Sequence, residues 1–181
     1  MDVHIREMTE ADCDAVAEIR VRGWQAAYRG LIPQAHLDAM SVEEDAARRR
    51  ELWADRNSTV TNLIAERNGT PVGWAAYGPY RTDGPYPNDP RRTADGELYA
   101  IYVHPGEYGG GIGQALMAET LTRATAAGYP TLYLWVLTGN ARARRFYEHA
   151  GFHADGVEEP FEVDGEPVPE MRYAQVVGDL R

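Results

Sequence analysis

A cluster of glycines between a strand and a helix constrains this chain more than any other feature. Glu97 to Val103 (ELYAIYV) predicts a strand that ends at His104-Pro105, and Gly109-Gly110-Gly111-Ile112-Gly113 then opens an Ala-rich helix that closes near Gly128. Glycines at such a junction let the backbone approach a ligand closely, and the free N–H groups of a helix N-terminus attract anions such as pyrophosphate. The segment predicts a phosphate-binding loop, with a glycine-rich turn that binds nothing as the alternative.

Two common phosphate-binding motifs do not fit this cluster. A nucleotide P-loop requires Gly-Lys-Ser/Thr, and the chain contains no lysine. A dinucleotide fingerprint that begins at Gly111 needs a small residue where Leu116 stands, and one that begins at Gly109 needs a small residue where Gln114 stands. The phosphate-bearing ligand therefore belongs to another class.

The remaining pattern predicts strands and helices around this junction. We expect strands at 3–5, 58–67, 71–78, 97–103, 131–137, 152–157 and 169–177, and helices from Thr9 to about Tyr28, from Ser41 to about Ala54, from the glycine cluster to about Ala127, and from Asn140 to Gly151. Asn68-Gly69 is a strong hairpin signal. This order predicts one α/β (α+β) domain over residues 1–181, with a long loop at 79–95 that is either a functional loop or disordered.

Charge and cysteine usage narrow the possible partners. The chain has 28 Asp plus Glu against 18 basic residues, which gives a net charge of -10. Such a balance argues against nucleic acid or an anionic membrane, and it favours an amine partner unless it only provides solubility. A lone cysteine, Cys13, excludes an internal disulfide, and an acidic N-terminus without a long apolar run predicts a cytoplasmic protein, with a composition typical of a high-GC bacterium.

Two motifs in order resemble the GCN5-related N-acetyltransferase (GNAT) superfamily. The run from Val103 to Gly113 resembles the acyl-CoA signature of that family, Val-x-Pro followed by Gln/Arg-x-x-Gly-x-Gly/Ala. The run from Asn140 to Phe152 resembles its second signature, Asn-x-x-Ala-x-x-Phe-Tyr-Glu-x-x-Gly-Phe. The resemblance implies a mixed, mostly antiparallel central sheet with a splayed parallel strand pair that binds acyl-CoA, flanked by four helices.

The resemblance also implies which residues hold the co-substrate, acetyl-CoA. The expected cofactor-binding residues are Ile101, Val103, Tyr108, Gly109, Gly110, Gly111, Ile112, Gly113, Gln114, Asn140 and Phe146. Tyr108 departs from the family pattern, because Gln or Arg normally stands there and helps to hold the pyrophosphate. An arginine from 142–145, or Arg91 or Arg92, is expected to supply the missing cation.

The chemistry of acetyl transfer needs a base for the amine, donors for the developing oxyanion and an acid for the leaving thiolate. By resemblance, Tyr147 is the expected acid, Glu97 the expected base, and backbone N–H groups in the region Ile101 to Val103 the expected oxyanion donors. The alternatives are a tyrosine packed on the core and an exposed glutamate at a strand end. Asn140 either caps its helix, binds CoA, or does both.

On the acceptor side, the resemblance points to the first helices, the loop before the central strand and the terminal strands. These supply Trp24, Tyr28 and Tyr80 as expected substrate-binding residues, together with Tyr86, Asp83, Asp89, Asp95 and an acidic stretch from Asp155 to Glu170. Aromatic rings with carboxylates suit an ammonium group. No metal site is expected, since His149, His153 and Asp155 are divided by the helix end at Gly151.

The sequence thus predicts an N-acetyltransferase that moves an acetyl group from acetyl-CoA to a small-molecule or peptide amine in a ternary complex. One alternative is a non-catalytic acyl-CoA-binding module, and another is a transferase for a different acyl group. A homodimer is possible by resemblance, because dimers are common in the family.

Overall fold

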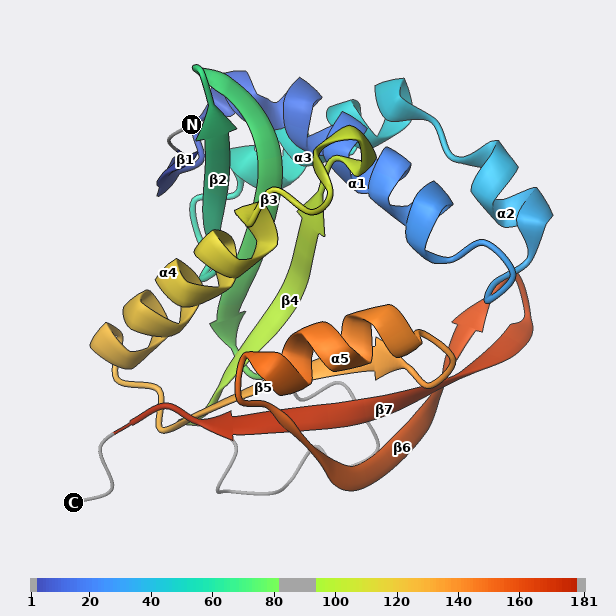
Figure 1. Ribbon diagram of the computed structural model, residues 1–181. Coiled ribbons are helices and arrows are strands. Elements are labelled where there is room, and N and C mark those ends of the chain that lie inside the picture. Colours follow the sequence, from blue (N-terminus) through green and yellow to red (C-terminus); the bar gives the residue numbers. More distant parts are fainter. Residues whose placement is uncertain (1–2, 82–93, 179–181) are drawn as a thin grey trace.

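A computed structural model describes residues 3–81 and 94–178 as a seven-stranded sheet with helices on both faces (Figure 1). The strands are β1 (Val3–Glu7), β2 (Thr61–Arg67), β3 (Thr70–Pro79), β4 (Gly96–Val103), β5 (Thr131–Leu137), β6 (His153–Val163) and β7 (Glu166–Val176). The helices are α1 (Cys13–Ala27), α2 (Gln34–Ala39), α3 (Val42–Ala54), α4 (Ile112–Ala126) and α5 (Ala141–His149), with short 3-10 turns η1 (Glu10–Asp12) and η3 (Pro105–Glu107).

The sheet has the order β1-β2-β3-β4-β5-β7-β6, and its only parallel neighbours among the described strands are β4 and β5. Their pairing stops after two positions, Gly96 with Leu132 and Glu97 with Tyr133. Beyond Glu97 the two strands diverge, which Figure 1 shows as the angle between β4 and β5. The expected mixed, mostly antiparallel sheet with a splayed parallel pair is confirmed.

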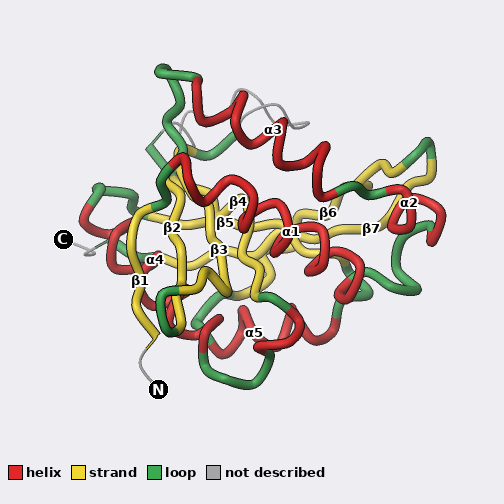
Figure 2. Tube along the Cα trace, turned by 90° about the horizontal axis from the view of Figure 1, so that it is seen from above, coloured by secondary structure: helices red, strands yellow, loops and turns green. Residues whose placement is uncertain are grey.

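Helices cover the two faces of the sheet separately. Seen from above in Figure 2, α1 and α3 lie on one side of the strands, and α4 and α5 lie on the other. The core beneath α4 contains buried Leu63, Leu116 and Leu134, whereas the core beneath α1 contains Val16, Ile64 and Trp74. In β5, Leu132, Leu134 and Val136 are buried in the core beneath α4, whereas Tyr133 and Trp135 on the other face are half-buried.

A bulge in β4 adds to the divergence of the strands. Ala100 pairs with Ala76 and Leu98 pairs with Tyr77, so Tyr99 has no partner residue on β3. A bulged residue bends its strand and changes the direction of nearby side chains. Here it lies at the point where β4 leaves β5.

Glycine turns join the antiparallel strands as the sequence predicts. Asn68 and Gly69 both have positive φ, 53° and 77°, between β2 and β3. Asp164 and Gly165, with φ of 52° and 81°, make the same turn between β6 and β7. Two consecutive positive φ angles define the tight hairpin turn whose twist matches the strands.

The structure differs from the sequence prediction in two elements. It has five α-helices in the described ranges rather than four, because α2 forms in the connection after Gly30. It also extends the terminal hairpin, so that β6 ends at Val163 and β7 begins at Glu166, where a shorter pair was expected. Prolines and glutamates in 158–169 hid these strand ends, since both residue types are depleted in strands.

Within the described ranges, no helix has both the length and the apolar character needed to cross a membrane.

Asp12 fixes the start of α1 and gives a prediction for stability. Its carboxylate is 5% exposed and accepts hydrogen bonds from the Arg6 guanidinium, at 2.7 and 2.8 Å, and from the Thr9 backbone N–H, at 2.7 Å. The Arg6 hydrogen bonds lower the pKa of Asp12. We expect Asp12→Asn to lower the free energy of unfolding by about 2 kcal/mol at pH 7, measured by urea denaturation.

The folded-state pKa of Asp12 is lowered, so its contribution is present above the unfolded pKa and is lost as the pH falls through the folded pKa. The difference between wild type and Asp12→Asn should therefore shrink in acid. The matched control is Asp14→Asn, because Asp14 is 71% exposed and its ion pair with Arg50 is at the surface. We expect that control to lose less than about 0.5 kcal/mol. An equal loss in both variants would contradict this account of Asp12.

Candidate functional site

Two cavities meet where β4 and β5 diverge. The first, of about 440 Å³, is called here the helix cavity; it lies between β4, the start of α4 and α5, and it includes residues 98–103 and 111–114. The second, of about 400 Å³, is called the hairpin cavity and includes Glu97, Glu159 and Glu170. Both are lined by Tyr28, Leu98, Tyr99, Tyr102 and Trp135. The two cavities are therefore adjacent along one opening through the sheet.

The mouth of the helix cavity is made of the glycine loop and the first turn of α4. Gly109 and Gly111 have φ of 82° and 76°, a conformation that side chains with a Cβ rarely adopt. The first backbone bond of the helix runs from Ala115 N–H to Gly111 C=O at 3.0 Å. The N–H groups of Ile112, Gly113 and Gln114 come before it and belong to the unpaired N-terminal set of the helix. The N-terminus of this 15-residue helix therefore faces the cavity with unpaired N–H groups, an arrangement that attracts an anion.

An arginine on β2 clamps the loop before this helix. Arg67 makes an ion pair with Glu107 and donates to the Gly110 carbonyl at 3.3 Å. Gly110 is thereby held toward Arg67 and does not line the helix cavity, unlike the expected ligand-binding residues Gly109 and Gly111. The Arg67 charge is neutralised by Glu107, so the clamp fixes the loop without adding net positive charge.

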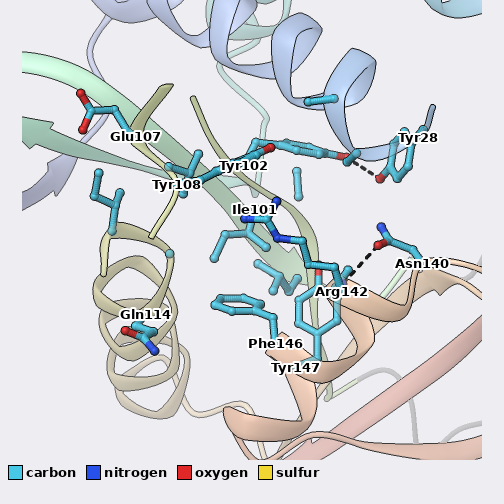
Figure 3. A pocket seen from close by; sticks show the side chains of 18 of the residues that line it. Tyr28, Ile101, Tyr102, Glu107, Tyr108, Gln114, Asn140, Arg142, Phe146 and Tyr147 are labelled. Atoms are coloured by element: carbon cyan, nitrogen blue, oxygen red, sulfur yellow. Dashed lines mark hydrogen bonds between the residues drawn. The ribbon is translucent and has the colours of Figure 1, made fainter. Parts of the chain in front are cut away.

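Tyr108 is covered by an arginine from α5. The Arg142 guanidinium carbon lies 4.0 Å from the centre of the Tyr108 ring, and both residues line the helix cavity. Figure 3 shows Arg142 reaching from α5 across the cavity toward β4 and Tyr108. Burial raises the pKa of Tyr108, which Arg142 partly offsets. A cation thus lies beside the position where the family has Gln or Arg.

Helix α5 is fixed by polar contacts at its N-terminus and near its middle. Asn140 caps it, accepting from Ala143 N–H at 3.1 Å, and also lines the helix cavity. Arg144 donates to the Tyr173 hydroxyl at 3.0 Å and to the Thr138 carbonyl at 3.1 Å. These bonds tie α5 to β7 and to the end of β5. The expected residues on α5 are therefore held at the cavity by a rigid element.

Phe146 sets the approach of α5 to α4. A Cβ built on Gly113 would lie 3.3 Å from the Phe146 ring, so the glycine leaves room for close contact of the two helices. Ile101 and Val103 face the same cavity from β4, as does Gln114 from the first turn of α4. The structure brings these expected residues together around one space.

Three tyrosines lie along the inner part of the opening. Tyr147 extends from α5 into the helix cavity (Figure 3), and burial raises its pKa above the ordinary value. The hydroxyls of Tyr28 and Tyr102 are 3.1 Å apart and hydrogen-bonded, and burial raises the pKa of both. All three therefore remain protonated near neutral pH and serve as hydrogen-bond donors.

Glu97 has surroundings that differ from the sequence expectation. It lines the hairpin cavity but is only 2% exposed. Its Oε2 accepts from the Arg81 backbone N–H at 3.0 Å, and its Oε1 accepts from the Arg81 guanidinium at 2.9 Å. The alternative of an exposed glutamate at the strand end is wrong, because Glu97 is buried and Arg81 binds both of its oxygens.

Two other carboxylates face the hairpin cavity from the terminal hairpin. Glu159 of β6 and Glu170 of β7 are direct cross-strand partners, and Glu170 also pairs with Leu137 of β5. Glu159 Oε2 is buried and has no hydrogen-bond partner. Burial, together with the charges of Glu159 and Glu97, raises the pKa of Glu170 to about 7. From the sequence alone only the acidic stretch from Asp155 to Glu170 is apparent, because strand register decides which acids meet.

Aromatic side chains complete the hairpin cavity. Trp24 and Tyr80 line it as expected, and Trp24 packs edge-on against Tyr28 with ring centroids 4.9 Å apart. Tyr80 is 8% exposed, and its hydroxyl accepts from Arg172 at 3.2 Å. The other loop candidates, Asp83, Tyr86, Asp89, Arg91 and Arg92, lie outside the described residues, as does most of the 79–95 loop. Asp95 is described but does not line either cavity.

In residues 3–81 and 94–178, no three His, Cys, Asp or Glu side chains are arranged so that they could hold one metal ion.

Comparison with known proteins gives a consistent result. A model of the acetyltransferase (GNAT) family matches residues 21–152. An uncharacterized N-acetyltransferase of Mycobacterium tuberculosis is 31% identical over 148 residues, which cover 80% of this chain and 85% of that protein.

A mycothiol acetyltransferase of Frankia casuarinae is 36% identical over 132 residues, 72% of this chain. The matched region is only 38% of the length of that relative. Among solved structures, yncA of Salmonella typhimurium with its cofactor acetyl-CoA superposes with a TM-score of 0.70 at 21% identity, covering 100% of this chain and 97% of the other. At that identity the likeness shows the fold alone.

The left-handed glycine at the start of α4 gives a prediction for ligand binding. We expect Gly111→Ala to weaken coenzyme A binding about five- to tenfold, measured by titration calorimetry, because the strained backbone redirects the N–H groups of the loop. Gly128→Ala is the matched control, since Gly128 also has positive φ, 88°, but closes the far end of α4. Each variant should lose about 1 kcal/mol of stability. Equal coenzyme A affinity in the two variants would contradict the assignment of the loop.

Proposed function

Since the chain belongs to the acetyltransferase (GNAT) family, we propose that it transfers an acetyl group from acetyl-CoA to a primary amine by direct attack in a ternary complex. One observation carries the proposal: the helix cavity and the hairpin cavity share Tyr28, Tyr102 and Trp135 at the opening between β4 and β5. A donor in one cavity and an acceptor in the other meet there without a covalent enzyme intermediate.

The residues of the helix cavity fit an acyl-CoA. Gly109, Gly111 and the first N–H groups of α4 would hold the pyrophosphate, and Arg142 beside Tyr108 supplies a cation at the same mouth. The diverging edge of β4 leaves backbone groups without a partner on β5 after Glu97, and these would hold the acetyl oxygen. A polyanion therefore finds local partners although the whole chain carries a charge of -10.

The bound thioester supplies an activated acetyl group, and the protein has to manage two protons. The acceptor nitrogen forms a bond to the acetyl carbon while the carbon–sulfur bond breaks. The acceptor arrives as an ammonium ion and gives one proton to a carboxylate of the hairpin cavity before it attacks. The leaving thiolate receives a hydrogen bond and then a proton from Tyr147, whose pKa is raised by burial and whose hydroxyl is protonated at neutral pH. The nitrogen loses its second proton as the amide forms, and that proton returns the Tyr147 oxygen to its hydroxyl form.

A protein base is needed because the acceptor arrives charged. An alkylamine with a pKa of about 10.4 is neutral only about once in 2,500 molecules at pH 7, which corresponds to about 4.6 kcal/mol. The hairpin cavity offers carboxylates that attract the ammonium and aromatic rings that contact its carbon chain. In this proposal Glu97 is neutralised by its ion pair with Arg81, and Glu159 and Glu170 are the carboxylates that attract the ammonium.

One observation favours a second candidate, a non-catalytic acyl-CoA-binding protein. Tyr108 replaces the Gln or Arg that the family signature carries. An altered phosphate contact is compatible with binding without turnover.

Thiol release from acetyl-CoA separates the two candidates. The acceptors to test are L-lysine, spermidine, 2-phenylethylamine and a peptide with a free N-terminal alanine, each with product identification by mass spectrometry. Acetylation of any of these amines supports the transferase. Acetyl-CoA binding by calorimetry without acetylation of any amine supports the binding protein.

Tyr147→Phe tests the proton donor. We expect kcat to fall about 100-fold, within the range for loss of a general acid, while the Kd for acetyl-CoA changes less than threefold. The ratio of wild-type kcat to Tyr147→Phe kcat should stay constant between about pH 6 and 9, because the Tyr147 hydroxyl, whose pKa is raised, does not titrate in that range. A variant with wild-type kcat would remove Tyr147 from the mechanism.

Arg142→Ala tests the cation beside Tyr108. We expect the Kd for coenzyme A to rise about tenfold, with a weaker salt dependence than in wild type, because a charge-assisted contact is lost. Arg145→Ala is the matched control, because Arg145 lies on the same helix but does not line the helix cavity. If both variants bound coenzyme A as wild type does, Arg142 would have no role in holding the phosphates.

A further inference from the structure

The carboxylates of the hairpin cavity differ in their freedom to accept a proton. Among the described residues, Glu97, Glu159 and Glu170 line this cavity. Glu97 is the position that the family resemblance indicates for the base. Its two oxygens are bound by the backbone and the guanidinium of Arg81, at 3.0 and 2.9 Å. Both Glu97 oxygens therefore already accept hydrogen bonds within the protein, and neither is left for the acceptor amine.

Glu159 and Glu170 have the opposite environment. They are opposite each other on β6 and β7, so their side chains leave the same face of the sheet with Cβ atoms about 5 Å apart. Arg172, two residues along β7, is paired with Asp155 at 2.6 Å and with the Tyr80 hydroxyl. Glu159 Oε2 is buried without a hydrogen-bond donor. A proton taken up by Glu170 would place a hydrogen-bond donor beside this carboxylate.

The register also directs Glu170 toward the opening. Glu170 pairs with Leu137, so the two side chains lie on the same face of the sheet. Trp135, two residues before Leu137 on β5, lies on that face as well. Leu137 lines the hairpin cavity, and Trp135 lines both cavities. Glu170 is half-buried in this wall, accessible to an acceptor amine in the cavity.

We propose that Glu170 is the catalytic residue that takes the proton from the acceptor ammonium, and that Glu159 positions this proton by sharing it. This role rests on the proposed function, and it assigns the base to Glu170 in place of Glu97, which the sequence predicts. A proton leaves the ammonium nitrogen for a Glu170 oxygen, the freed nitrogen lone pair attacks the acetyl carbon, and the carbon–sulfur bond breaks. The thiolate takes a proton from Tyr147, which regains one from the nitrogen as the amide forms. Glu170 then releases its proton to solvent.

The electrostatics around Glu170 support this role. The charged groups that face it are Glu159 from β6, Glu97 from β4 and Arg81 after β3, with paired Arg172 on its own strand. Burial and the two carboxylates raise its pKa to about 7, and Arg81 partly opposes this shift. Glu170 is therefore ionised, and competent to accept a proton, above about pH 7, and it is protonated below.

The first test needs no substrate. Carbon-13 NMR of protein labelled at the glutamate carboxyls should show one resonance that titrates near pH 7. We expect Glu170→Gln to abolish that titration and Glu97→Gln to leave it in place, shifted to lower pH. A resonance near pH 7 that survives in Glu170→Gln would overturn the assignment.

The second test is the pH dependence of kcat/KM with the amine that wild type acetylates fastest among L-lysine, spermidine, 2-phenylethylamine and the alanine peptide. In wild type, kcat/KM should rise with pH, with the midpoint of the rise near pH 7. Glu170→Gln should abolish that rise, and its kcat at pH 8 should be about 100-fold lower than that of wild type. Glu97→Gln should keep the rise, and Glu170→Asp should restore part of the rate. Thermal unfolding and acetyl-CoA affinity serve as folding controls for every variant.

The outcomes separate the two levels of the proposal. A rise that persists in Glu170→Gln, or one that disappears only in Glu97→Gln, overturns the role of Glu170 and leaves the transferase in place. A wild-type protein that acetylates none of the amines overturns the proposed function and the role of Glu170 together.

Discussion

Hydrogen bonding between β4 and β5 ends after two residue pairs, and the site depends on that early end. Gly96 and Glu97 still pair with β5, whereas the backbone edge that begins at Leu98 faces an opening. The bulge at Tyr99 lies at the same point and bends β4 away. A fully paired sheet would close the opening, and the two cavities would then be separated by a continuous layer. Here they meet at shared residues, where the proposed donor and acceptor would reach each other.

The two cavities have opposite electrostatic character. The helix cavity has unpaired N–H groups at the start of α4 and the Arg142 guanidinium, whereas the hairpin cavity has Glu159 and Glu170 beside the Glu97–Arg81 ion pair. A phosphate-bearing donor and an ammonium-bearing acceptor would each find complementary charge on its own side. The net charge of the chain does not reveal this division. The proposed anion site consists largely of backbone N–H groups, which carry no formal charge, and Arg67 beside it is neutralised by Glu107.

Local sequence signals predicted much of the fold and half of the site. The turns at Asn68-Gly69 and Asp164-Gly165, the glycine loop and the Asn140 cap each follow from a few neighbouring residues. The contacts between Arg81 and Glu97 and between Glu159 and Glu170 do not, because they depend on strand register and on a chain reversal across the sheet. The sequence also leaves open which arginine lies beside Tyr108, because that contact depends on how α5 packs against the glycine loop; in the structure it is Arg142. Sequence therefore located the donor side better than the acceptor side.

A structure of the protein with coenzyme A would show whether the opening between β4 and β5 is where donor and acceptor meet. We expect the pyrophosphate to lie on the N–H groups at the start of α4, and the thiol to lie in that opening, near Tyr147 and beyond the last pair of Glu97 with Tyr133. We also expect the hairpin cavity to stay free for the acceptor. Coenzyme A bound across Glu159 and Glu170, or a thiol outside the opening, would contradict this arrangement.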